Sequence, residues 1–448
     1  MKTILTSLFV CFLFQPLLIK GQSDNYFSLW NDPEVEQKIN RGIQENRKGF
    51  ATLIFKDVEG KTIENASVTI KQISHDFLFG ANIFMFDGFD DESKNQRYNS
   101  MFTDLLNYAS LPFYWAALEP EPGNLRFEAG SEPIYRRPPP DPIVKFCKTN
   151  NVTMKGHTLI WDSPNWSVPE WLPEVPSQIS PLINNRITQI ADRYGDDIMI
   201  WDVANEVIAR KPHVIMPKDF ALSAFQQSEK VFPLHATLIL NETTTHSWRN
   251  FKGEYSPFYM LIDNLLMRGA KIDAIGFQFH FFSEKLHQDV LDGKEMQPLH
   301  MWEVMDRYSD FELPIHITEI TIPALPYNEE GLKSQAELTK DFYRLWFAHP
   351  NVEAITWWNV ADGTAVPGED KWHGGFLDND LNPKPAYEVL NQLINEEWNT
   401  QLTKEVNGPL KFQGFYGKYL IRGDYNGQEF EKEIHLSKNG QTKFIIQL

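Results

Sequence analysis

Cysteine is almost absent from this sequence of 448 residues, which contains only two. Cys11 lies in an apolar N-terminal run, and Cys147 lies far along the chain. If the N-terminal run is removed, one cysteine remains, and a lone cysteine cannot form an intrachain disulfide. We therefore expect Cys147 to be a buried apolar residue in a fold that has no disulfide.

Positive charge is also scarce. The chain has 42 Lys and Arg against 60 Asp and Glu, which gives a formal net charge of −18 at pH 7. Proteins that bind nucleic acid or anionic membranes need clustered Lys and Arg. The composition therefore argues against a nucleic-acid partner and favours a neutral or cationic one.

Long apolar runs are missing beyond the N-terminus. Met1-Lys2-Thr3 precedes a run from Ile4 to Ile19, and Lys20-Gly21 follows it, which is the pattern of a secretory signal. The run is shorter than the roughly 20 residues that cross a bilayer. We expect residues 1–21 to be a signal peptide and the mature chain to be secreted, extracellular or periplasmic, without a membrane span. A membrane anchor is the alternative.

Internal repeats and long low-complexity linkers are absent as well, whereas aromatic residues are plentiful. The chain contains 13 Trp, 15 Tyr and 32 Phe, which provide flat apolar faces for binding. Its length is enough for one barrel of about 250 residues or more and a smaller module.

Two segments near the chain ends are rich in β-forming residues. Their strand-like runs are residues 50–55 and 66–72 near the N-terminus, and 419–423, 430–434 and 443–447 near the C-terminus. The turn residues Asp57 to Gly60 predict a hairpin within residues 22–74. An isolated hairpin is unstable in water, so it must pack on something. We expect residues 399–448 to pack with it in one small accessory β module.

Residues 75–398 alternate short apolar runs with longer amphipathic stretches, which is typical of βα units and a parallel sheet. Eight strands are expected, at residues 77–83, 108–113, 152–160, 198–203, 237–240, 274–278, 314–318 and 354–358. Eight parallel strands close a barrel. The predicted fold class is therefore α/β, a (β/α)₈ TIM barrel with the accessory β module beside it.

Charged residues stand at the ends of two predicted strands, where catalytic groups lie in parallel barrels. The fourth strand leads into Glu206 and the seventh into Glu319. Glycoside hydrolysis needs two carboxyl groups, because one protonates the leaving oxygen while the other attacks the anomeric carbon. The pair therefore predicts a glycosidase. A surface cap or salt bridge is the alternative for each glutamate taken alone.

Other residues at the strand ends are candidates for binding the sugar. Gln278 and His280 are two residues apart on one strand and so face the same way, which places His280 to hydrogen-bond a carboxylate. Trp161, Trp358 and Trp372 offer rings on which sugars stack. A core position is the alternative for each of these tryptophans and for His280.

Six segments, which form five motifs in order along the barrel, resemble glycoside hydrolase family 10, the family of β-1,4-xylanases. They are Lys155–Trp161 (KGHTLIW), Trp201–Glu206 (WDVANE), Gly276–His280 (GFQFH), Ile317–Thr321 (ITEIT), and Ile355–Trp358 (ITWW) with Pro383–Tyr387 (PKPAY). The resemblance covers the whole predicted barrel. It implies the retaining mechanism, with Glu206 as general acid/base and Glu319 as nucleophile.

The same resemblance implies the surroundings of the two glutamates. Asn205 would donate to the 2-hydroxyl of the sugar in the cleaved subsite, and His157 and Gln278 would line that subsite. His280 would orient the nucleophile. The resemblance also implies Trp358 as a hydrophobic floor and Trp372 as a second wall, with no metal or organic cofactor.

Three departures from the family motifs concern the substrate. Leu111 and Tyr114 stand where the family has an Asn and a Lys that bind the neighbouring sugar, and Asp162 replaces a His. A site built on hydrogen bonds discriminates strongly when a partner is missing. We expect hydrolysis of a β-1,4-linked polysaccharide, with xylan or a related hemicellulose as substrate. A non-xylan β-glycan, exo action and a non-catalytic carbohydrate-binding barrel are the alternatives.

Overall fold

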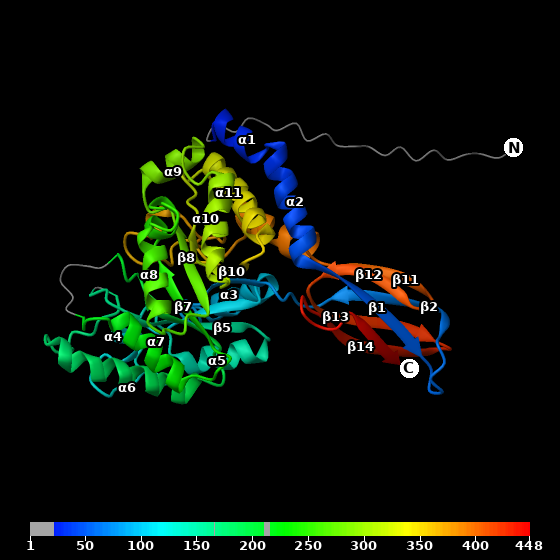
Figure 1. Cartoon of the computed structure of the whole chain (residues 1–448), viewed down its shortest axis with the longest axis horizontal. Coiled ribbons are helices and arrows are strands. Elements are labelled where there is room, and N and C mark those ends of the chain that lie inside the picture. The colour runs from blue at the N-terminus through cyan, green and yellow to red at the C-terminus, as the bar shows by residue number, and fades with distance from the viewer. Residues whose placement is uncertain (1–21, 165, 210–215) are drawn as a thin grey trace.

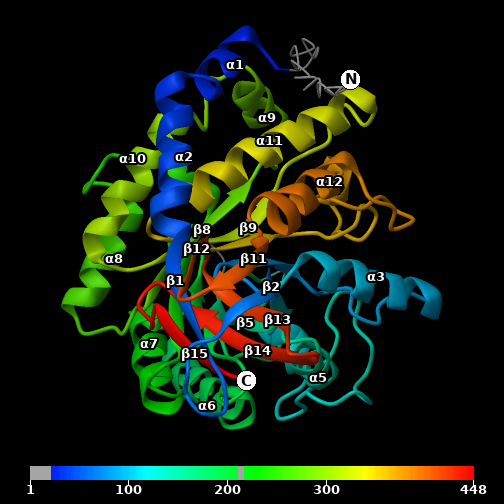
Figure 2. The same ribbon diagram turned by 90° about the vertical axis from the view of Figure 1, so that its right-hand side faces the viewer.

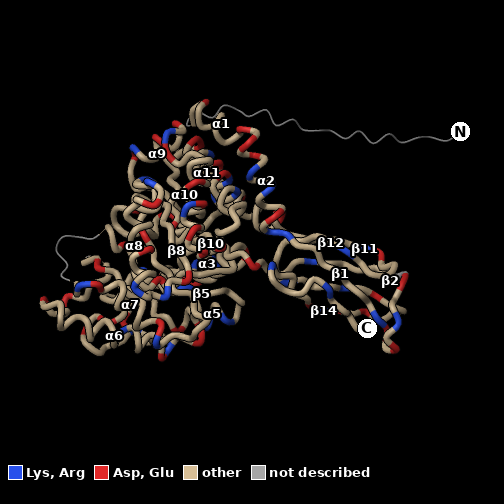
Figure 3. The backbone as a smooth tube through the Cα atoms, in the orientation of Figure 1, with Lys and Arg blue, Asp and Glu red and all other residues tan. Residues whose placement is uncertain are grey.

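The computed structural model describes residues 22–164, 166–209 and 216–448, so the predicted signal peptide lies outside the described residues. The chain forms an α/β barrel with a β-sandwich beside it (Figure 1). Acidic and basic residues are interspersed over both parts (Figure 3). Among the described residues, no helix combines the length and the apolar character that crossing a membrane requires.

Eight parallel strands form the barrel and confirm the predicted set. They are β3 (Leu78–Asn82), β4 (Tyr108–Pro112), β5 (Thr153–Trp161), β6 (Ile200–Asn205), β7 (Thr237–Glu242), β8 (Ala274–His280), β9 (Ile315–Thr321) and β10 (Val352–Trp357). Each strand pairs with the next in sequence, and β10 pairs with β3 to close the barrel. The strands are buried on both faces, as a parallel sheet covered by helices requires.

Helices surround the barrel, and proline at the first helical position begins several of them. The helices are α1 (Asp24–Trp30), α2 (Pro33–Arg47), α3 (Glu92–Leu105), α4 (Trp115–Leu118), α5 (Pro140–Thr149), α6 (Pro176–Tyr194), α7 (Phe220–Val231), α8 (Pro257–Met267), α9 (Glu284–Leu291), α10 (Pro298–Tyr308), α11 (Glu329–Ala348) and α12 (Pro385–Asn391). Short π and 3₁₀ turns add η1 (Thr245–Arg249), η2 (Ser309–Phe311), η3 (Asp370–Trp372) and η4 (Gln392–Glu397). Cys147 in α5 is fully buried, as predicted, and burial raises the pKa of its thiol to about 12.

Helix α2 joins the N-terminal segment to the barrel. Asp32 caps its first turn, and Val35, Ile39 and Ile43 form a buried stripe at helical spacing. At its last residue, the guanidinium of Arg47 is buried and donates to the carbonyl oxygens of Phe347, His349 and Val352. These bonds hold the end of α2 against the end of α11 and the start of β10.

The sandwich combines strands from the two ends of the described chain (Figure 2). Its strands are β1 (Lys48–Lys56), β2 (Glu64–Gln72), β11 (Gln401–Asn407), β12 (Leu410–Phe415), β13 (Gly417–Tyr425), β14 (Gln428–Leu436) and β15 (Lys443–Gln447). One sheet has the order β12-β1-β15 and the other β11-β2-β13-β14. Their facing sides enclose a core that includes Leu53, Ile70 and Tyr419. This arrangement confirms an accessory β module built from both terminal segments.

The predicted N-terminal hairpin is wrong, because β1 and β2 belong to different sheets. Beyond one bridge between Lys56 and Thr62, the two strands diverge. Leu53 on β1 and Ile70 on β2 are both fully buried, and both belong to the core between the two sheets. A turn signal fixes where the chain reverses, but burial of both apolar faces decides which strand each one pairs with.

The C-terminal turn is a true hairpin. Strands β13 and β14 pair up to Tyr425 and Gln428, which leaves Asn426 and Gly427 as a two-residue loop. Both loop residues have positive φ, at 55° and 79°. Asn-Gly favours this left-handed pair, whose twist matches that of the flanking strands.

We predict that Gly156→Ala destabilises the barrel. A Cβ atom at Gly156 on β5 would lie 2.0 Å from Cζ3 of the Trp201 ring on β6, and that ring is fully buried. Overpacking of this kind costs about 1–3 kcal/mol or more in free energy of unfolding, measurable by urea titration. Gly130→Ala is the control, because no atom lies within 4 Å of its added Cβ. Equal stability of the two variants would contradict the packing described.

Candidate active site

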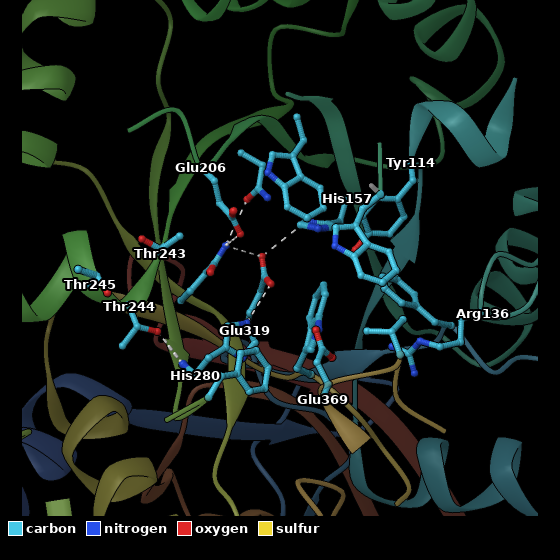
Figure 4. Close-up of a pocket in the computed structure, with 18 of the residues that line it drawn as sticks. Tyr114, Arg136, His157, Glu206, Thr243, Thr244, Thr245, His280, Glu319 and Glu369 are labelled. Carbon is cyan, nitrogen blue, oxygen red and sulfur yellow. Dashed lines mark hydrogen bonds and ion pairs between the residues drawn. The ribbon is translucent and has the colours of Figure 1, made fainter. Parts of the chain in front are cut away.

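A cavity of about 310 Å³ opens at the carboxyl ends of the barrel strands. Eight of the residues predicted from the sequence line it. They are His157, Trp161, Asn205, Glu206, Gln278, His280, Glu319 and Trp358. Figure 4 shows the side chains of Glu206 and Glu319 converging near its centre.

The two glutamates share one hydrogen-bond donor. Nε2 of Gln278 lies 3.0 Å from Oε1 of Glu206 and 3.1 Å from Oε1 of Glu319. An amide nitrogen carries two hydrogens, so it can donate to both carboxylates at once. The two oxygen atoms are therefore no more than about 6 Å apart, the sum of these distances, within reach of the roughly 5–5.5 Å of retaining glycosidases.

Glu319 is almost fully buried but surrounded by donors. Its Oε1 accepts from Nδ2 of Asn241 at 2.8 Å, and its Oε2 lies 3.2 Å from Nε2 of His280. Burial alone raises the pKa of this carboxyl. The charge at His157 and the hydrogen bond from His280 outweigh burial, and the pKa of Glu319 lies below its ordinary value. The arrangement keeps Glu319 ionised.

Glu206 follows the last residue of β6 directly. Its φ of 53° is left-handed, which is uncommon for a residue with a side chain. Its backbone N–H donates to the carbonyl oxygen of Asn241 at 2.9 Å, so the strand pairing continues one residue past the strand. The chain thus turns sharply at Glu206 while its carboxyl stays at the cavity.

A buried ion pair between Lys155 and Asp202 lies next to His157 of the site. Oδ2 of Asp202 lies 2.9 Å from Nζ of Lys155 and 2.8 Å from Nδ1 of His157, and all three side chains are buried. Burial would raise the pKa of Asp202, but the Lys155 charge and the His157 hydrogen bond lower it below its ordinary value. The ionised Asp202 therefore fixes the ring of His157, which lies 3.9 Å from Glu319.

Asn241 links the neighbouring strands and was not predicted as a site residue. Its Nδ2 donates to Oδ1 of Asn205 at 2.7 Å as well as to Glu319, and its Oδ1 accepts from Thr318 at 2.6 Å. The sequence offered a signal, because Asn241 lies at a strand end like Glu206. It also begins an N-x-T sequence, but its side chain is fully buried and cannot carry a glycan in this fold.

Aromatic rings form one wall of the cavity. Tyr114 contacts the ring of His157 with centroids 5.4 Å apart, and Trp358 contacts the same ring at 5.2 Å. Phe84 packs edge-on against both Tyr114 and Trp358, and Trp161 lies beside them. Leu111, the other departure near this wall, is fully buried in the core and does not line the cavity.

The structure does not bring Trp372 to the cavity wall. Its ring is buried behind Phe282, with centroids 6.4 Å apart, and it is Phe282 that lines the cavity. Phe282 also stacks on His280 at 4.5 Å. The sequence analysis did not name Phe282, although extending the period-two alternation of Gln278 and His280 by one step reaches it.

Asp162 directly follows β5 and Glu242 is the last residue of β7, and both carboxyl groups are buried. Glu242 accepts from the backbone N–H groups of Ile208 and Thr243. Burial, with a smaller effect from the negative charge of Asp162, nevertheless raises the pKa of Glu242 to about 7. The replacement of a family His by Asp162 therefore puts a second acid beside Glu242.

Several lining residues lie outside the barrel strands, and the sequence did not single them out. They are Phe84, Arg136, Arg137, Trp166, Thr243, Thr244, Thr245, Arg249, Ser283, Leu286, Val366 and Glu369. Thr245 and Arg249 belong to η1 and Leu286 to α9, and the others lie in loops, which follow no strand or helix period. In the described part of the chain, no group of three or more His, Cys, Asp or Glu side chains is placed to hold a metal ion.

Comparison with known protein families identifies the family of the chain. The profile of glycosyl hydrolase family 10 matches residues 89–393. The chain belongs to glycosyl hydrolase family 10. The match runs from the loop after β3 to the end of the barrel, so it includes the strands that carry Glu206 and Glu319.

Several known proteins are similar to this chain in sequence. The chain is 25% identical over 407 residues to anti-sigma-I factor RsgI6 of Acetivibrio thermocellus, covering 87% of this chain and 47% of that protein. It is 25% identical over 415 residues to endo-1,4-beta-xylanase 2 of Arabidopsis thaliana, covering 90% and 35%. The chain thus spans less than half of these relatives. It is 26% identical over 298 residues to endo-1,4-beta-xylanase B of Thermotoga neapolitana, covering 63% and 78%.

Solved family 10 structures share the fold. The native xylanase 10B of Thermotoga maritima superimposes with a TM-score of 0.58 at 22% identity, covering 72% of this chain and 96% of that one. The xylanase 10B of Thermotoga petrophila, solved with xylobiose, gives 0.58 at 23% identity, with 72% and 95% covered. The (β/α)₈ fold and the family predicted from five motifs are confirmed.

We predict that Asp202→Asn strongly destabilises the protein. The substitution leaves the buried Lys155 charge without its partner, which costs about 3–5 kcal/mol in free energy of unfolding. Asp197→Asn is the matched control, because the Asp197–Lys148 pair is exposed and such pairs contribute about 0–1 kcal/mol. Chemical denaturation of both variants checks the difference, and similar losses would contradict a stabilising role for the buried pair.

Proposed function

We propose that the chain is a retaining β-glycoside hydrolase that cleaves a β-1,4-linked polysaccharide, with xylan or a related hemicellulose as substrate. The observation that carries the proposal is the single amide of Gln278 between the carboxylates of Glu206 and Glu319. Inverting enzymes hold their carboxyl groups about 6.5–9.5 Å apart to admit a water molecule. The shorter spacing supports double displacement.

The roles of the two glutamates follow from their surroundings. The lowered pKa of Glu319 keeps it ionised, so it attacks the anomeric carbon while Glu206 gives a proton to the departing glycosidic oxygen. The anomeric C–O bond breaks and a glycosyl-Glu319 ester forms. In the second step Glu206 takes a proton from water, and the resulting hydroxide attacks the anomeric carbon and releases Glu319.

The neighbouring side chains position the sugar and the nucleophile. The carbonyl oxygen of Asn205 accepts from Asn241, which leaves its amide nitrogen to donate to a sugar hydroxyl. Gln278 and His157 line the same subsite, and His280 orients Glu319. Trp358 forms the apolar floor, with Trp161 next to it in the aromatic wall.

The names of relatives support xylan, since two similar proteins are endo-1,4-beta-xylanases. The second candidate, a different β-glycan or exo action, is favoured by the wall around Tyr114, because Leu111 is withdrawn into the core and Tyr114 carries no charge. Product analysis on xylan and on other β-glycans separates the candidates.

We also propose secretion, with residues 1–21 as the signal.

We predict that the Glu319→Ala and Glu206→Ala variants give glycosyl azides of opposite anomeric configuration when azide is added. Glu319→Ala lowers kcat by more than about 10⁴-fold, and added azide gives the α-glycosyl azide because it attacks the substrate directly. Glu206→Ala lowers kcat about 10²–10⁴-fold on poor leaving groups, and azide gives the β-product from the covalent intermediate. Proton NMR of the products distinguishes them. Wild-type activity in either variant would overturn the assignment. It would also be overturned if the unsubstituted protein bound carbohydrate but hydrolysed none.

We predict that His280→Gln shifts the acid limb of the pH profile of kcat/KM to higher pH. The hydrogen bond and charge of His280 lower the pKa of Glu319, so their loss raises it. Glu319 must be ionised to attack, and the acid limb of kcat/KM therefore moves to higher pH. His300→Gln, an exposed histidine of α10, should leave the limb in place. An unchanged limb in His280→Gln would contradict the role of His280.

A further inference from the structure

Two adjacent arginines line the cavity on one side of the glutamate pair. Figure 4 shows Arg136 and Tyr114 on one side of Glu206 and Glu319, and Thr243 to Thr245 on the other. Arg136 is 4% exposed and Arg137 is 9% exposed. Burial of a guanidinium is costly unless a partner compensates it, so each contact of these two side chains matters.

Backbone oxygens hold the two side chains but supply no negative charge. Nη1 of Arg136 donates to the carbonyl oxygen of Thr364 at 2.5 Å, and Nη1 of Arg137 donates to that of Arg136 at 2.9 Å. Nε of Arg136 is buried without a hydrogen-bond partner among the described residues. Within residues 22–164, 166–209 and 216–448, no carboxylate oxygen lies within 4.0 Å of either guanidinium.

One carboxylate, Glu369, lines the cavity near Arg136 and Arg137, so two positive charges face one negative charge. Glu369 interacts electrostatically with both arginines, while its Oε2 accepts from Nδ2 of Asn359 at 3.4 Å. Burial lowers the pKa of Arg137 to about 10, so it stays protonated at neutral pH. This side of the cavity therefore keeps a net positive charge, although the whole chain carries −18.

The guanidinium of Arg137 is also held in a fixed orientation. It lies 3.9 Å from the ring centroid of Tyr114 and 5.4 Å from that of Phe84. Stacking of this kind leaves the N–H edge of the fork free to meet a planar anion. The fork therefore presents donors next to the wall where a sugar binds.

We propose that Arg136 and Arg137 form a binding site for the carboxylate of a uronic acid in the substrate, on the Tyr114 side of the cavity. The proposal rests on the proposed glycosidase function and names the substrate class more closely. A carboxylate matches the guanidinium fork in shape and charge, and it supplies the anion that the buried pair lacks. The uronic acid is either a branch on the polysaccharide or a sugar of its main chain.

The experiment compares kcat/KM on neutral and acidic substrates of equal length. The probes are xylotetraose, xylotetraose with a glucuronic acid branch, and a glucuronic acid oligosaccharide for the main-chain case. The wild type should prefer one acidic probe at least tenfold. Arg137→Gln should lower kcat/KM on that probe by about 10- to 100-fold and reduce the preference for that probe over xylotetraose at least tenfold.

Two further variants keep the test decisive. Arg137→Lys retains the positive charge but lacks the planar guanidinium group. Its kcat/KM on the acidic probe should lie between that of Arg137→Gln and that of the wild type. Arg249→Gln is the matched control, because Arg249 lines the cavity beside Thr245 and pairs with Glu295 at 3.2 Å. It should not change the preference for the acidic probe. Equal loss on neutral and acidic probes in Arg137→Gln would overturn the carboxylate site, since a ligand of neutral hydroxyls gives that result.

A binding measurement separates failure of the site from failure of the proposed function. Calorimetry with Glu319→Gln protein uses the same three probes and needs no hydrolysis. Tighter binding of an acidic probe that is lost in the Glu319→Gln, Arg137→Gln double variant supports the site. Equal binding of all probes overturns it. Wild-type protein that hydrolyses none of the probes would overturn the proposed function, while calorimetry would still decide on the carboxylate site.

Discussion

Closure of the barrel, by pairing of β10 with β3, is the constraint on which the rest of the site depends. Glu206 and Glu319 are far apart in sequence, and two strands separate β6 from β9 in the sheet. Each intervening strand contributes one amide to the pair, Asn241 from β7 and Gln278 from β8. The parallel register sets these amides level with the carboxylates, because Asn205 pairs with Asn241 and Gln278 with Glu319.

The barrel was predictable because its strands are short apolar runs that end in polar residues, and the strand-end rule located Glu206 and Glu319 before any geometry was known. The sandwich was only partly predictable. The Asn426-Gly427 turn specifies its hairpin locally, through left-handed backbone. The strands that pair with β1 and β2 instead lie more than 300 residues further along the chain, and no local sequence pattern predicts this pairing.

The residues proposed to bind the substrate differ in the same way in how far the sequence predicts them. Asn205, His157 and Gln278 lie on strands, so period and motif both indicate them. Arg136 and Arg137 lie in the long loop before α5, where their position depends on a carbonyl oxygen of Thr364 in another loop. The residues proposed to break the glycosidic bond thus lie on or directly after strands, whereas the arginines proposed to select an acidic substrate lie in a loop that only folding brings to the cavity.

The barrel is inserted between two strands of the sandwich, since β2 precedes it and β11, which pairs with β2, follows it. During synthesis β1 and β2 leave the ribosome more than 300 residues ahead of their partners, a delay of about half a minute at typical elongation rates. Until then their edges are open to other chains. The sandwich therefore cannot be completed before the whole barrel has been synthesised, and pairing of β2 with β11 requires the folded barrel to hold its own two ends close together.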